Sequence, residues 1–383
     1  MSEKLKTAIV GLGKVADLHS SALIKLKESQ FTAVCSSKID KAERYAAKYN
    51  VKAYTDVSEM VMKEKIDVVI VCTPHPYHRK PTIDAIEAGA NVLIEKPFAS
   101  SLEDCDAMLD ASKKHKKQIG VICQRRWYLP VQRVKAAIDA GKIGRPVFGT
   151  VNMLGWRDEG YYNSDPWRGS WDGEGGGVLV NQAPHQLDLI QWFMGEIDEL
   201  YGVWSNLNHP YIEVEDTANA IIKFKSGAVA NILVSNSQKP GIYGKVHVHG
   251  ENGASIGVQT DGGAMFIAGM SNILEPPIND LWTVPGEEQL LKSWVKDDSD
   301  FFLSLKNPME YFHERQIEDF LKALIEDRKP YITGEDGRVT VEIFTAIYRS
   351  TRDNKPIKWP LKPEFKNDFD GRISIKSQTS KLR

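Results

Sequence analysis

The stretch that decides the fold is Thr7-Ala-Ile-Val-Gly-Leu-Gly-Lys-Val-Ala16, in a chain of 383 residues. Its apolar start predicts a buried strand, and the glycines after it predict a tight turn into a helix that runs to Lys27. In this setting Gly11 permits the turn, Gly13 lets a pyrophosphate approach the backbone, and Ala16 keeps helix and strand close. The residues expected to bind a dinucleotide here are Gly11, Leu12, Gly13, Lys14 and Val15.

Strands and helices continue to alternate after this motif. Strands are expected at residues 31–36, 66–73, 91–94 and 119–123, and helices at residues 41–49, 77–88 and 102–113. Strands separated by helical segments fold into a parallel sheet with helices on both faces. Residues 1–124 are therefore expected to form a Rossmann domain, a doubly wound parallel sheet in an α/β protein.

The stretch Asn91-Val-Leu-Ile-Glu-Lys-Pro97 places charged residues at the end of a buried strand. Ligands of open parallel sheets bind outside the carboxyl ends of the strands, so Lys96 is expected to face a site. Pro97 cannot continue a central strand, and the bond before it can be cis. The alternative is a solvated lysine at a strand end.

The second strand ends in Ser36-Ser37-Lys38. NAD-selective enzymes usually place an acid here, which binds the ribose 2′-hydroxyl. Two hydroxyls and a cation would accept a 2′-phosphate, and nothing at these positions repels NAD. The cofactor is therefore expected to be NAD or NADP, unless Lys38 is only a solvated turn residue.

The length exceeds that of one typical core, so a second domain is expected over residues 125–360, followed by a polar tail at 361–383. Its strands are expected at residues 147–154, 199–204, 218–224, 228–235 and 244–249, and its helices at 131–140, 310–324 and 339–350. Runs joined by short turns indicate a large, mostly antiparallel open sheet in an α+β domain. One face of such a sheet needs a cover, which predicts a homo-oligomer, a dimer or tetramer.

The composition limits the classes of molecule that the protein is expected to bind. Lys plus Arg total 49 and Asp plus Glu total 51, so the net charge of −2 leaves no basic excess for nucleic acid or an anionic membrane. The polar start has no signal-peptide core, and no apolar run approaches the length of a membrane span. The four cysteines are scattered. These features predict a reduced, cytoplasmic protein that binds a small molecule.

A second group of chemically active residues follows three glycines at 175–177. The glycines let the backbone pass close to something, and Pro184 suits the first turn of a helix. His185 and Asp188 are three apart and share a helix face, where the carboxylate can orient the imidazole. The alternative is a structural histidine. The side chains expected to bind substrate are Lys96, Arg126, Tyr162, Arg168, Asn181, Gln182 and His185.

These motifs resemble the Gfo/Idh/MocA oxidoreductases. The resemblance rests on the glycine turn, Cys72-Thr73-Pro74, Glu95-Lys96-Pro97 and the segment from Gly175 to Asp188. It implies that Lys96 and His185 are catalytic and that Asp188 is the acid that commonly follows the histidine. Asn181 stands where many members have an aspartate. Further residues that the resemblance implies at the cofactor are Thr73, Pro74, His78, Glu95, Lys96, Gln124, Trp167 and Arg168.

The expected reaction is transfer of a hydride from a secondary hydroxyl of a pyranose, glycoside or anhydrosugar to nicotinamide, with C3 as a candidate carbon. His185 would take the hydroxyl proton and Lys96 would stabilise the oxygen. The segment from Pro240 to Gly250 resembles levoglucosan dehydrogenase and related pyranoside 3-dehydrogenases. Two alternatives are a glycoside-cleaving enzyme that oxidises C3 transiently and a sensor without turnover. No metal is expected.

Overall fold

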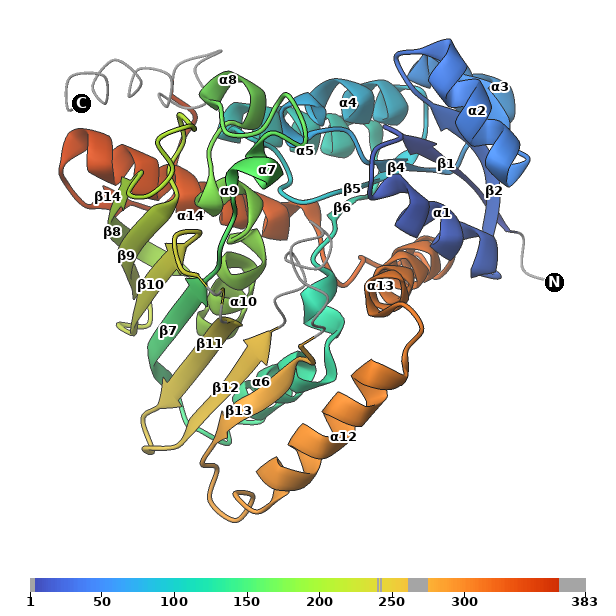
Figure 1. Ribbon diagram of the computed structural model, residues 1–383. Helices are drawn as coiled ribbons and strands as arrows, with labels where there is room; N and C mark the ends of the chain where they lie inside the picture. Colours follow the sequence, from blue (N-terminus) through green and yellow to red (C-terminus); the bar gives the residue numbers. More distant parts are fainter. Residues whose placement is uncertain (1–3, 240, 242, 261–274, 365–383) are drawn as a thin grey trace. The chain divides into compact units, whose positions relative to one another are not determined.

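The computed structural model describes residues 4–239, 241, 243–260 and 275–364 of the chain (Figure 1). It divides into two compact units, one of Met1–Gln124 with Asn307–Arg338 and one of Arg125–Lys306 with Val339–Arg383. The first unit thus includes a late segment that the sequence analysis placed in the second domain. Residues 240 and 242 of the levoglucosan-like segment, and all of the tail after residue 364, lie outside the described residues.

The first unit is built on a six-stranded sheet in the order β3-β2-β1-β4-β5-β6. Every adjacent pair is parallel, which confirms the predicted Rossmann sheet. The strands are β1 (Leu5–Val10), β2 (Ser29–Cys35), β3 (Lys52–Tyr54), β4 (Val68–Val71), β5 (Asn91–Ile94) and β6 (Ile119–Val121). The helices between them are α1 (Ala16–Lys25), α2 (Ile39–Tyr49), α3 (Val57–Glu64), α4 (Arg79–Glu87) and α5 (Leu102–His115). Short 3-10 turns occupy η1 (His75–Tyr77) and η2 (Gln124–Trp127).

Local chemistry sets where several helices begin. The side chain of Asp56 accepts a hydrogen bond from the main-chain N–H of Glu59 at the start of α3, and Ser101 does the same for Asp104 at the start of α5. The strands β4 and β5 are almost wholly buried and apolar, as expected for central parallel strands. The strand β3 and helix α3 were not predicted, because β3 has only three half-exposed residues and no apolar run.

The helix α13 (Pro308–Ile325) belongs to the first unit and packs against α1 (Figure 1). Its residues Ile317, Phe320 and Leu321 are buried in the same apolar cluster as β1, β4 and α1. Its Gln316 side chain accepts from the N–H of Cys123 at 2.9 Å and donates to the carbonyl of Val121 at 2.6 Å. A segment distant in sequence therefore completes the core beside β6.

The second unit is built on an eight-stranded sheet in the order β13-β12-β11-β7-β10-β9-β8-β14. The adjacent pairs are antiparallel except β7 and β10, which confirms the predicted mixed sheet. The strands are β7 (Pro146–Leu154), β8 (Ile197–Ser205), β9 (Thr217–Phe224), β10 (Val229–Ser235), β11 (Tyr243–Gly250), β12 (Ser255–Thr260), β13 (Ile278–Trp282) and β14 (Ile357–Lys358). The helices are α6 (Leu129–Asp139), α7 (Glu159–Tyr162), α8 (Trp171–Glu174), α9 (Val178–Asn181), α10 (Pro184–Met194), α12 (Leu290–Ser304) and, starting in the first unit, α14 (Gly334–Asp353).

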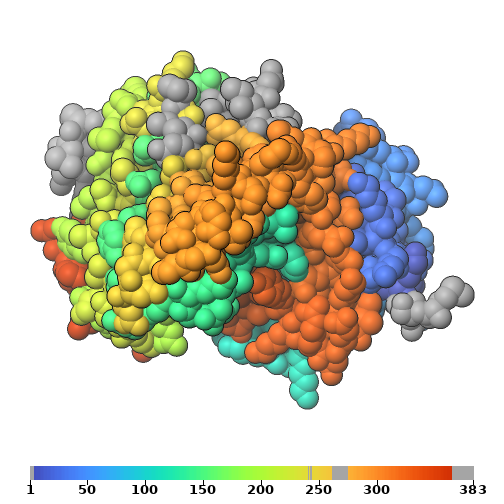
Figure 2. Space-filling model, turned by 90° about the horizontal axis from the view of Figure 1, so that it is seen from below, coloured from blue at the N-terminus to red at the C-terminus, as the bar shows by residue number. Residues whose placement is uncertain are grey.

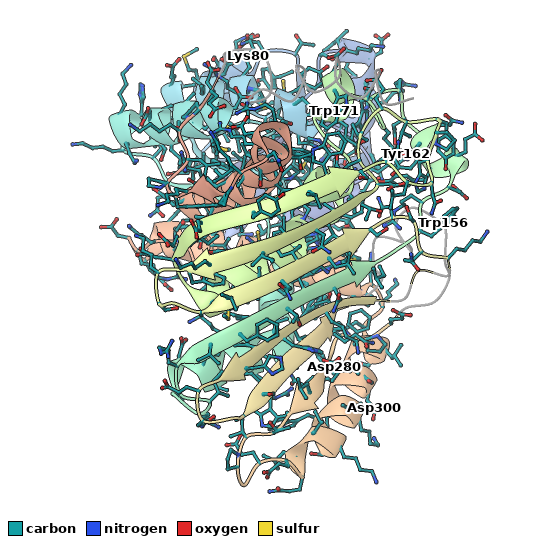
Figure 3. All side chains as sticks on the ribbon, turned by 90° about the vertical axis from the view of Figure 1, so that its left-hand side faces the viewer. Lys80, Trp156, Tyr162, Trp171, Asp280 and Asp300 are labelled. Atoms are coloured by element: carbon teal, nitrogen blue, oxygen red, sulfur yellow. The ribbon has the colours of Figure 1, made fainter. Side chains whose placement is uncertain are left out.

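The two faces of this sheet differ. Helix α10 packs on β7 and β11, and helix α6 packs on β12 and β13. Figure 3 looks onto the other face, where no described helix lies over the strands. Along β9, Ala218, Ala220 and Ile222 are buried, whereas the alternate residues are exposed. Helix α12 lies at the surface of its unit, where its outer side is visible in Figure 2.

Within the described part of the chain, none of the helices combines the length and apolar character needed to cross a bilayer.

The glycine turn provides a direct test of the fold. Gly11 has a φ of +89°, and a Cβ atom there would lie 2.5 Å from the main-chain nitrogen of Thr73, whereas a Cβ atom at Gly13 would meet nothing within 4 Å. We expect Gly11→Ala to lower the free energy of unfolding by about 2 kcal/mol or more, and Gly13→Ala to change it by less than about 1 kcal/mol. Urea unfolding of both variants measures the difference, and equal destabilisation would contradict the described turn.

Candidate active site

The predicted cofactor residues of the first unit lie at one edge of its sheet. Gly11 to Val15 follow β1, Ser36 to Lys38 follow β2, Thr73 and Pro74 follow β4, Glu95 and Lys96 follow β5, and Gln124 follows β6. Because all six strands are parallel, these ends meet on the same side of the sheet. The strand order reverses between β1 and β4, which is where the main chains of Gly11 and Thr73 approach each other closely. The structure therefore brings these residues together.

The turn at Gly13 has room for a phosphate group. Nothing lies within 4 Å of a Cβ atom built at Gly13, both Gly13 and Lys14 are exposed, and α1 begins at Ala16. The start of a helix offers main-chain N–H groups and the positive end of the helix dipole to an anion. The residues present thus fit the pyrophosphate of a dinucleotide.

His78 hydrogen-bonds to one main-chain carbonyl after β4 and to another after β5. Its Nε2 lies 2.9 Å from the carbonyl oxygen of Thr73 and its Nδ1 lies 3.2 Å from that of Phe98. Its side chain is buried, and burial lowers the pKa of its imidazole. A direct contact between His78 and a cofactor stays a prediction, and its described bonds hold the loop that carries Thr73.

The carboxylate of Glu95 is buried among protein groups. Its Oε1 lies 2.6 Å from Nε2 of His19 and 3.6 Å from Nε2 of His313, and its Oε2 accepts from the main-chain N–H of Lys96 at 3.1 Å. Lys96 itself is partly exposed and precedes a cis bond to Pro97, the isomer that the sequence analysis considered. Among the described residues, His19, Glu95 and His313 also form a group with the ligand types and spacing of a metal site.

In the second unit, several predicted substrate residues converge on the hydroxyl of Tyr161. This oxygen accepts from Arg168 at 2.6 Å, from Gln182 at 2.9 Å and from Asn181 at 3.3 Å. The guanidinium of Arg168 also stacks on the rings of Tyr161 and Trp167, 4.4 Å from each ring centre. The structure therefore brings the predicted substrate residues Arg168, Asn181 and Gln182 together, and Trp167, which was assigned to the cofactor, lies beside Arg168.

Asn236 extends the same cluster. Its side-chain amide donates to Oε1 of Gln182 at 3.0 Å and to the hydroxyl of Tyr162 at 3.4 Å. Tyr162 therefore joins the other predicted substrate residues. The cluster combines aromatic faces with amide, hydroxyl and guanidinium groups, which suits the C–H faces and hydroxyls of a carbohydrate.

A buried acid lies behind Asn181. Oε1 of Glu174 accepts from the amide of Asn181 at 2.5 Å, and its Oε2 accepts from the main-chain N–H of Gly169 at 2.7 Å. Burial raises the pKa of Glu174 to about 7, although these hydrogen bonds lower it. The carboxyl that the family resemblance would place at Asn181 is thus present on a neighbouring residue.

Two of the three glycines, Gly176 and Gly177, are explained by close contacts within the protein. A Cβ atom at Gly177 would overlap the carbonyl oxygen of Glu215, and one at Gly176 would overlap the hydroxyl of Tyr348. The Glu215 carboxylate accepts from the N–H of Gly177 at 2.9 Å and from that of Leu179 at 3.0 Å. This bond pattern fixes the start of α9 and so the position of Asn181 at its end.

Arg126 and Asp188 pair with each other. Nε of Arg126 donates to one carboxylate oxygen at 2.8 Å and Nη2 donates to the other at 2.6 Å, and both side chains are about 1% exposed. The guanidinium also lies 4.8 Å from the ring centre of Trp192. The described bonds make them a buried ion pair beside the first turn of α10. The assignment of Arg126 to the substrate and of Asp188 to His185 stays a prediction.

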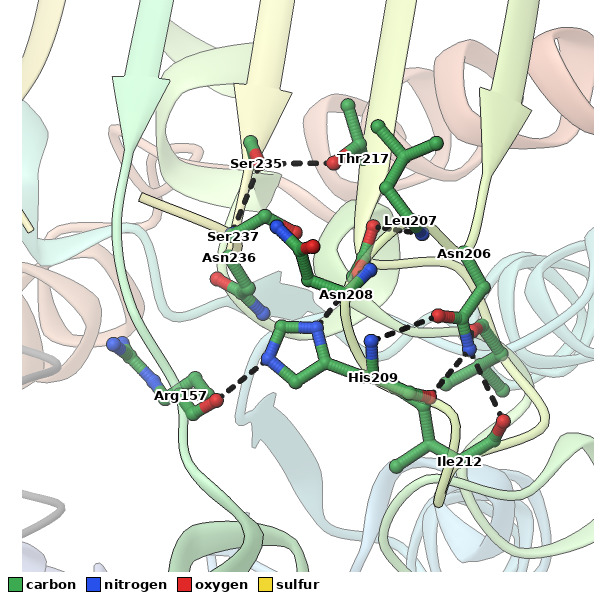
Figure 4. A network of polar contacts seen from close by, with 12 residues as sticks. Arg157, Asn206, Leu207, Asn208, His209, Ile212, Thr217, Ser235, Asn236 and Ser237 are labelled. Carbon is green, nitrogen blue, oxygen red and sulfur yellow. Dashed lines mark hydrogen bonds and ion pairs between the residues drawn. The ribbon is translucent and has the colours of Figure 1, made fainter. Parts of the chain in front are cut away.

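A hydrogen-bond network around His209 holds the loops beside this cluster (Figure 4). Nε2 of His209 lies 2.7 Å from the carbonyl oxygen of Arg157, and Nδ1 lies 2.7 Å from Asp216. Burial opposes ionisation of Asp216, but the hydrogen bonds from His209 and from nearby main-chain N–H groups lower its pKa to about 2.

Several of these residues were not predicted. The sequence analysis did not include Tyr161, Glu174, Asn236, His19 or His313 among the site residues. Their sequence neighbourhoods carry no motif that separates a buried polar residue from an exposed one. Only the position of Glu174 next to the three glycines offered a signal.

The first unit has the architecture of a dinucleotide-binding domain, and the second carries a polar cluster suited to a small polyhydroxy ligand. Comparison with known families agrees. Residues 5–123 match the family described as "Oxidoreductase family, NAD-binding Rossmann fold", and residues 131–256 match the "GFO/IDH/MocA C-terminal domain". The chain belongs to the Gfo/Idh/MocA oxidoreductases, as its motifs indicated.

Known relatives include enzymes that act on cyclitols and sugars. The chain is 26% identical over 376 residues to scyllo-inositol 2-dehydrogenase (NAD(+)) of Bacillus subtilis, covering 95% of this chain and 99% of that one. It is 31% identical over 202 residues to D-glucoside 3-dehydrogenase of Escherichia coli, covering 51% of this chain and 55% of that one. The structure of the WlbA dehydrogenase from Bordetella pertussis with NADH and UDP-GlcNAcA superposes with a TM-score of 0.81 at 26% identity, covering 94% of this chain and 99% of that one.

The raised pKa of Glu174 predicts a pH dependence of stability. The folded-state pKa is about 7 and the ordinary value is 4.5, so the stability tied to the protonated carboxyl is fully present below pH 4.5 and is lost as the pH rises to about 7. Relative to wild type, Glu174→Gln should therefore gain up to about 3 kcal/mol in free energy of unfolding across this range. Chemical unfolding at several pH values measures this gain.

The matched control for that experiment is Glu159→Gln, at an exposed position of α7. Its difference from wild type should stay constant over the same pH range. A constant difference for Glu174→Gln as well would contradict the buried, protonated carboxyl.

Proposed function

We propose that the protein oxidises a secondary hydroxyl of a sugar or cyclitol and transfers the hydride to NAD or NADP. The observation that carries this proposal is the pairing of two sets of groups in one chain. In the first unit, the ends of parallel strands, an open glycine turn and Lys96 lie at one edge of the sheet. In the second unit, aromatic and hydrogen-bonding side chains surround the hydroxyl of Tyr161. The family relatives support the same substrate class.

The reaction divides the work between few groups. Nicotinamide, when bound, accepts the hydride at C4 from the carbon that carries the hydroxyl. His185 takes the hydroxyl proton as general base, because imidazole titrates near neutral pH. Lys96 donates a hydrogen bond to the same oxygen and stabilises the negative charge that develops on it. The products are a ketone, the reduced cofactor and one proton.

The ion pair of Arg126 and Asp188 holds the helix on which His185 lies. The pair is buried and bidentate, so it holds the first turns of α10 in one place. We assign Arg126 and Asp188 to positioning of this helix. Asn181, Gln182 and Arg168 are assigned to substrate hydroxyls, and Tyr162 and Trp167 to the faces of the ring.

For the carbon oxidised, we propose C3 of a pyranose or glycoside. The support for C3 is the likeness to D-glucoside 3-dehydrogenase of Escherichia coli, and the likeness to the WlbA dehydrogenase bound to UDP-GlcNAcA supports a sugar ligand. The cyclitol relatives make inositols the comparison substrates. Product analysis of a pyranoside panel tests the assignment, and oxidation at any other carbon would overturn it.

The turn after β2 is assigned to the adenosine ribose of the cofactor. Ser37 and Lys38 are exposed, and Oγ of Ser36 lies within 3.5 Å of the N–H of Lys38, so hydroxyl and ammonium groups border this turn. Such groups accept a 2′-hydroxyl or a 2′-phosphate. A ratio of kcat/KM for NAD over NADP measures the preference, and insensitivity of that ratio to Lys38→Ala would contradict the assignment.

We also propose that two or more copies associate through the exposed face of the large sheet (Figure 3). Ile221 is 55% exposed, Val203 47% and Val229 39%, and all three lie on strands of this face. Exposed apolar residues on an uncovered sheet favour pairing. Sedimentation analysis should show a dimer or tetramer that Ile221→Arg weakens, and a wild-type monomer would contradict this proposal.

A cytoplasmic location completes the proposal. None of the four cysteines, Cys35, Cys72, Cys105 and Cys123, forms a disulfide, and all four are buried, as suits a reducing compartment. Cell fractionation tests this, and recovery of the protein outside the cytoplasm would overturn it.

The assay of Lys96 tests the reaction. Lys96→Met should lower kcat by about two orders of magnitude or more, because the oxygen loses its charged donor in the transition state. The dissociation constant for NADH, measured by fluorescence, should change by less than about twofold. Lys80→Met, at an exposed position of the same unit, serves as control. Equal losses of turnover and cofactor affinity in Lys96→Met would contradict the catalytic assignment.

A further inference from the structure

Three elements of the first unit each bring one side chain to a buried polar cluster. His19 comes from α1, Glu95 from the end of β5, and His313 from α13. Their exposed fractions are 0%, 7% and 3%. The rings of the two histidines meet edge to face, with their centres 5.4 Å apart. Burying polar groups this completely costs free energy unless hydrogen bonds compensate for it. The proposed reaction does not use His19 or His313.

The hydrogen bonds show how the cluster holds its charge. Nδ1 of His313 donates to the carbonyl of Met309 at 2.7 Å, so its Nε2 is directed to Glu95. His19 donates a hydrogen bond from Nε2 to Glu95 at 2.6 Å. Burial lowers the pKa of His19 and so favours the neutral ring, which can still donate this bond. Burial by itself raises the pKa of Glu95, but the bonds to His19 and His313 hold it well below its ordinary value.

The charge on Glu95 also acts on neighbouring groups. Burial raises the pKa of the Cys72 thiol, and the negative charge on Glu95 raises it further. The same charge opposes the effect of burial on the pKa of His78. Cys72 and His78 lie on either side of the β4 loop that carries Thr73. The Glu95 carboxylate, at the end of β5, therefore also acts on groups at the end of the neighbouring strand β4.

The second oxygen of Glu95 connects the cluster to Lys96. Oε2 accepts from the main-chain N–H of Lys96 at 3.1 Å, directly where β5 ends. An ionised acceptor strengthens this bond compared with a neutral one. The bond fixes the main chain from which the Lys96 side chain extends.

We propose that His19 and His313 are positioning residues for Lys96, which act by holding Glu95 as a fixed anion behind it. This inference rests on the proposed catalytic role of Lys96. It assigns a function to α13, the late segment that belongs to the first unit. That helix supplies one of the two histidines whose Nε2 faces Glu95, behind a lysine more than two hundred positions earlier in the chain.

A metal ion is the competing explanation for the cluster. The three ligand atoms lie within 4.8 Å of one another. However, the separation of 2.6 Å between His19 and Glu95 is that of a hydrogen bond. Two ligands of one zinc ion, each bonded at about 2.0–2.1 Å in tetrahedral geometry, stand roughly 3 Å or more apart. The described geometry therefore favours a proton-bonded cluster.

The first test separates positioning from cofactor binding. We expect Glu95→Gln and His313→Gln each to lower kcat roughly tenfold, because small displacements of a catalytic group are costly. The KM for the sugar and the dissociation constant for NADH should change by less than about twofold. His115→Gln, in the same unit at the end of α5, should leave all three constants unchanged. Losses confined to cofactor affinity, or no loss, would overturn the proposal.

A second test needs no turnover, so it separates this inference from the proposed function. The acylation rate of Lys96 is measured by mass spectrometry in wild type and Glu95→Gln, with exposed Lys80 as internal reference. Loss of the adjacent anion should raise the Lys96 rate at least about threefold, since that anion favours the unreactive ammonium form. An unchanged rate would overturn the positioning role even if the enzyme is active. A raised rate in a protein without dehydrogenase activity would refute only the proposed function.

Elemental analysis of the purified protein decides the competing explanation. The proposal predicts that the wild-type protein contains no stoichiometric metal at this cluster, so His313→Gln has none to lose. One equivalent of zinc or another transition metal, lost in that variant, would overturn it.

Discussion

A carboxylate removed from water must be met by hydrogen-bond donors, and this constraint organises both units of the protein. In the first unit Glu95 is met by two histidines and the N–H of Lys96. In the second, Asp188 is met by Arg126, and Glu215 by main-chain N–H groups of the glycine turn. An unmet charge at any of these places would cost several kcal/mol. Each buried acid therefore fixes a segment that carries a predicted functional residue.

The sequence predicted the architecture because its signals were local. The glycine turn, the apolar parallel strands and the alternating strands of the second unit each identify themselves within ten residues. The sequence did not show which segments far apart in the chain pack against each other. The pattern of α13 shows an apolar face but not its partner, and the face packs on α1 in the first unit. Short strands such as β3, and the strands β12 and β13 at one end of the large sheet, lack the alternation that marks longer ones.

The candidate site was predicted in part for the same reason. Lys96, Thr73 and the glycine turn follow strands, so their common edge could be inferred from the topology. Sequence spacing put His185 and Asp188 on one helix face, but it could not show that Arg126 binds the acid. Nor could it show that Glu174 supplies a buried carboxyl next to Asn181, because an acid in sequence looks the same whether buried or exposed. Two of the three glycines do make a close approach, Gly177 to Glu215 and Gly176 to Tyr348, so the groups approached belong to the protein itself.

The account depends on Lys96 and His185 acting on one oxygen, although they belong to different units of the chain. Each unit fixes its own residue through buried charges, and the reaction requires that both reach the same hydroxyl. The most direct measurement is a crystal structure of the protein with NADH and a pyranoside. The account predicts that Nζ of Lys96 and a ring nitrogen of His185 both lie about 3 Å from one hydroxyl oxygen, on the carbon that faces nicotinamide C4. A complex in which the two side chains face different cavities would contradict it.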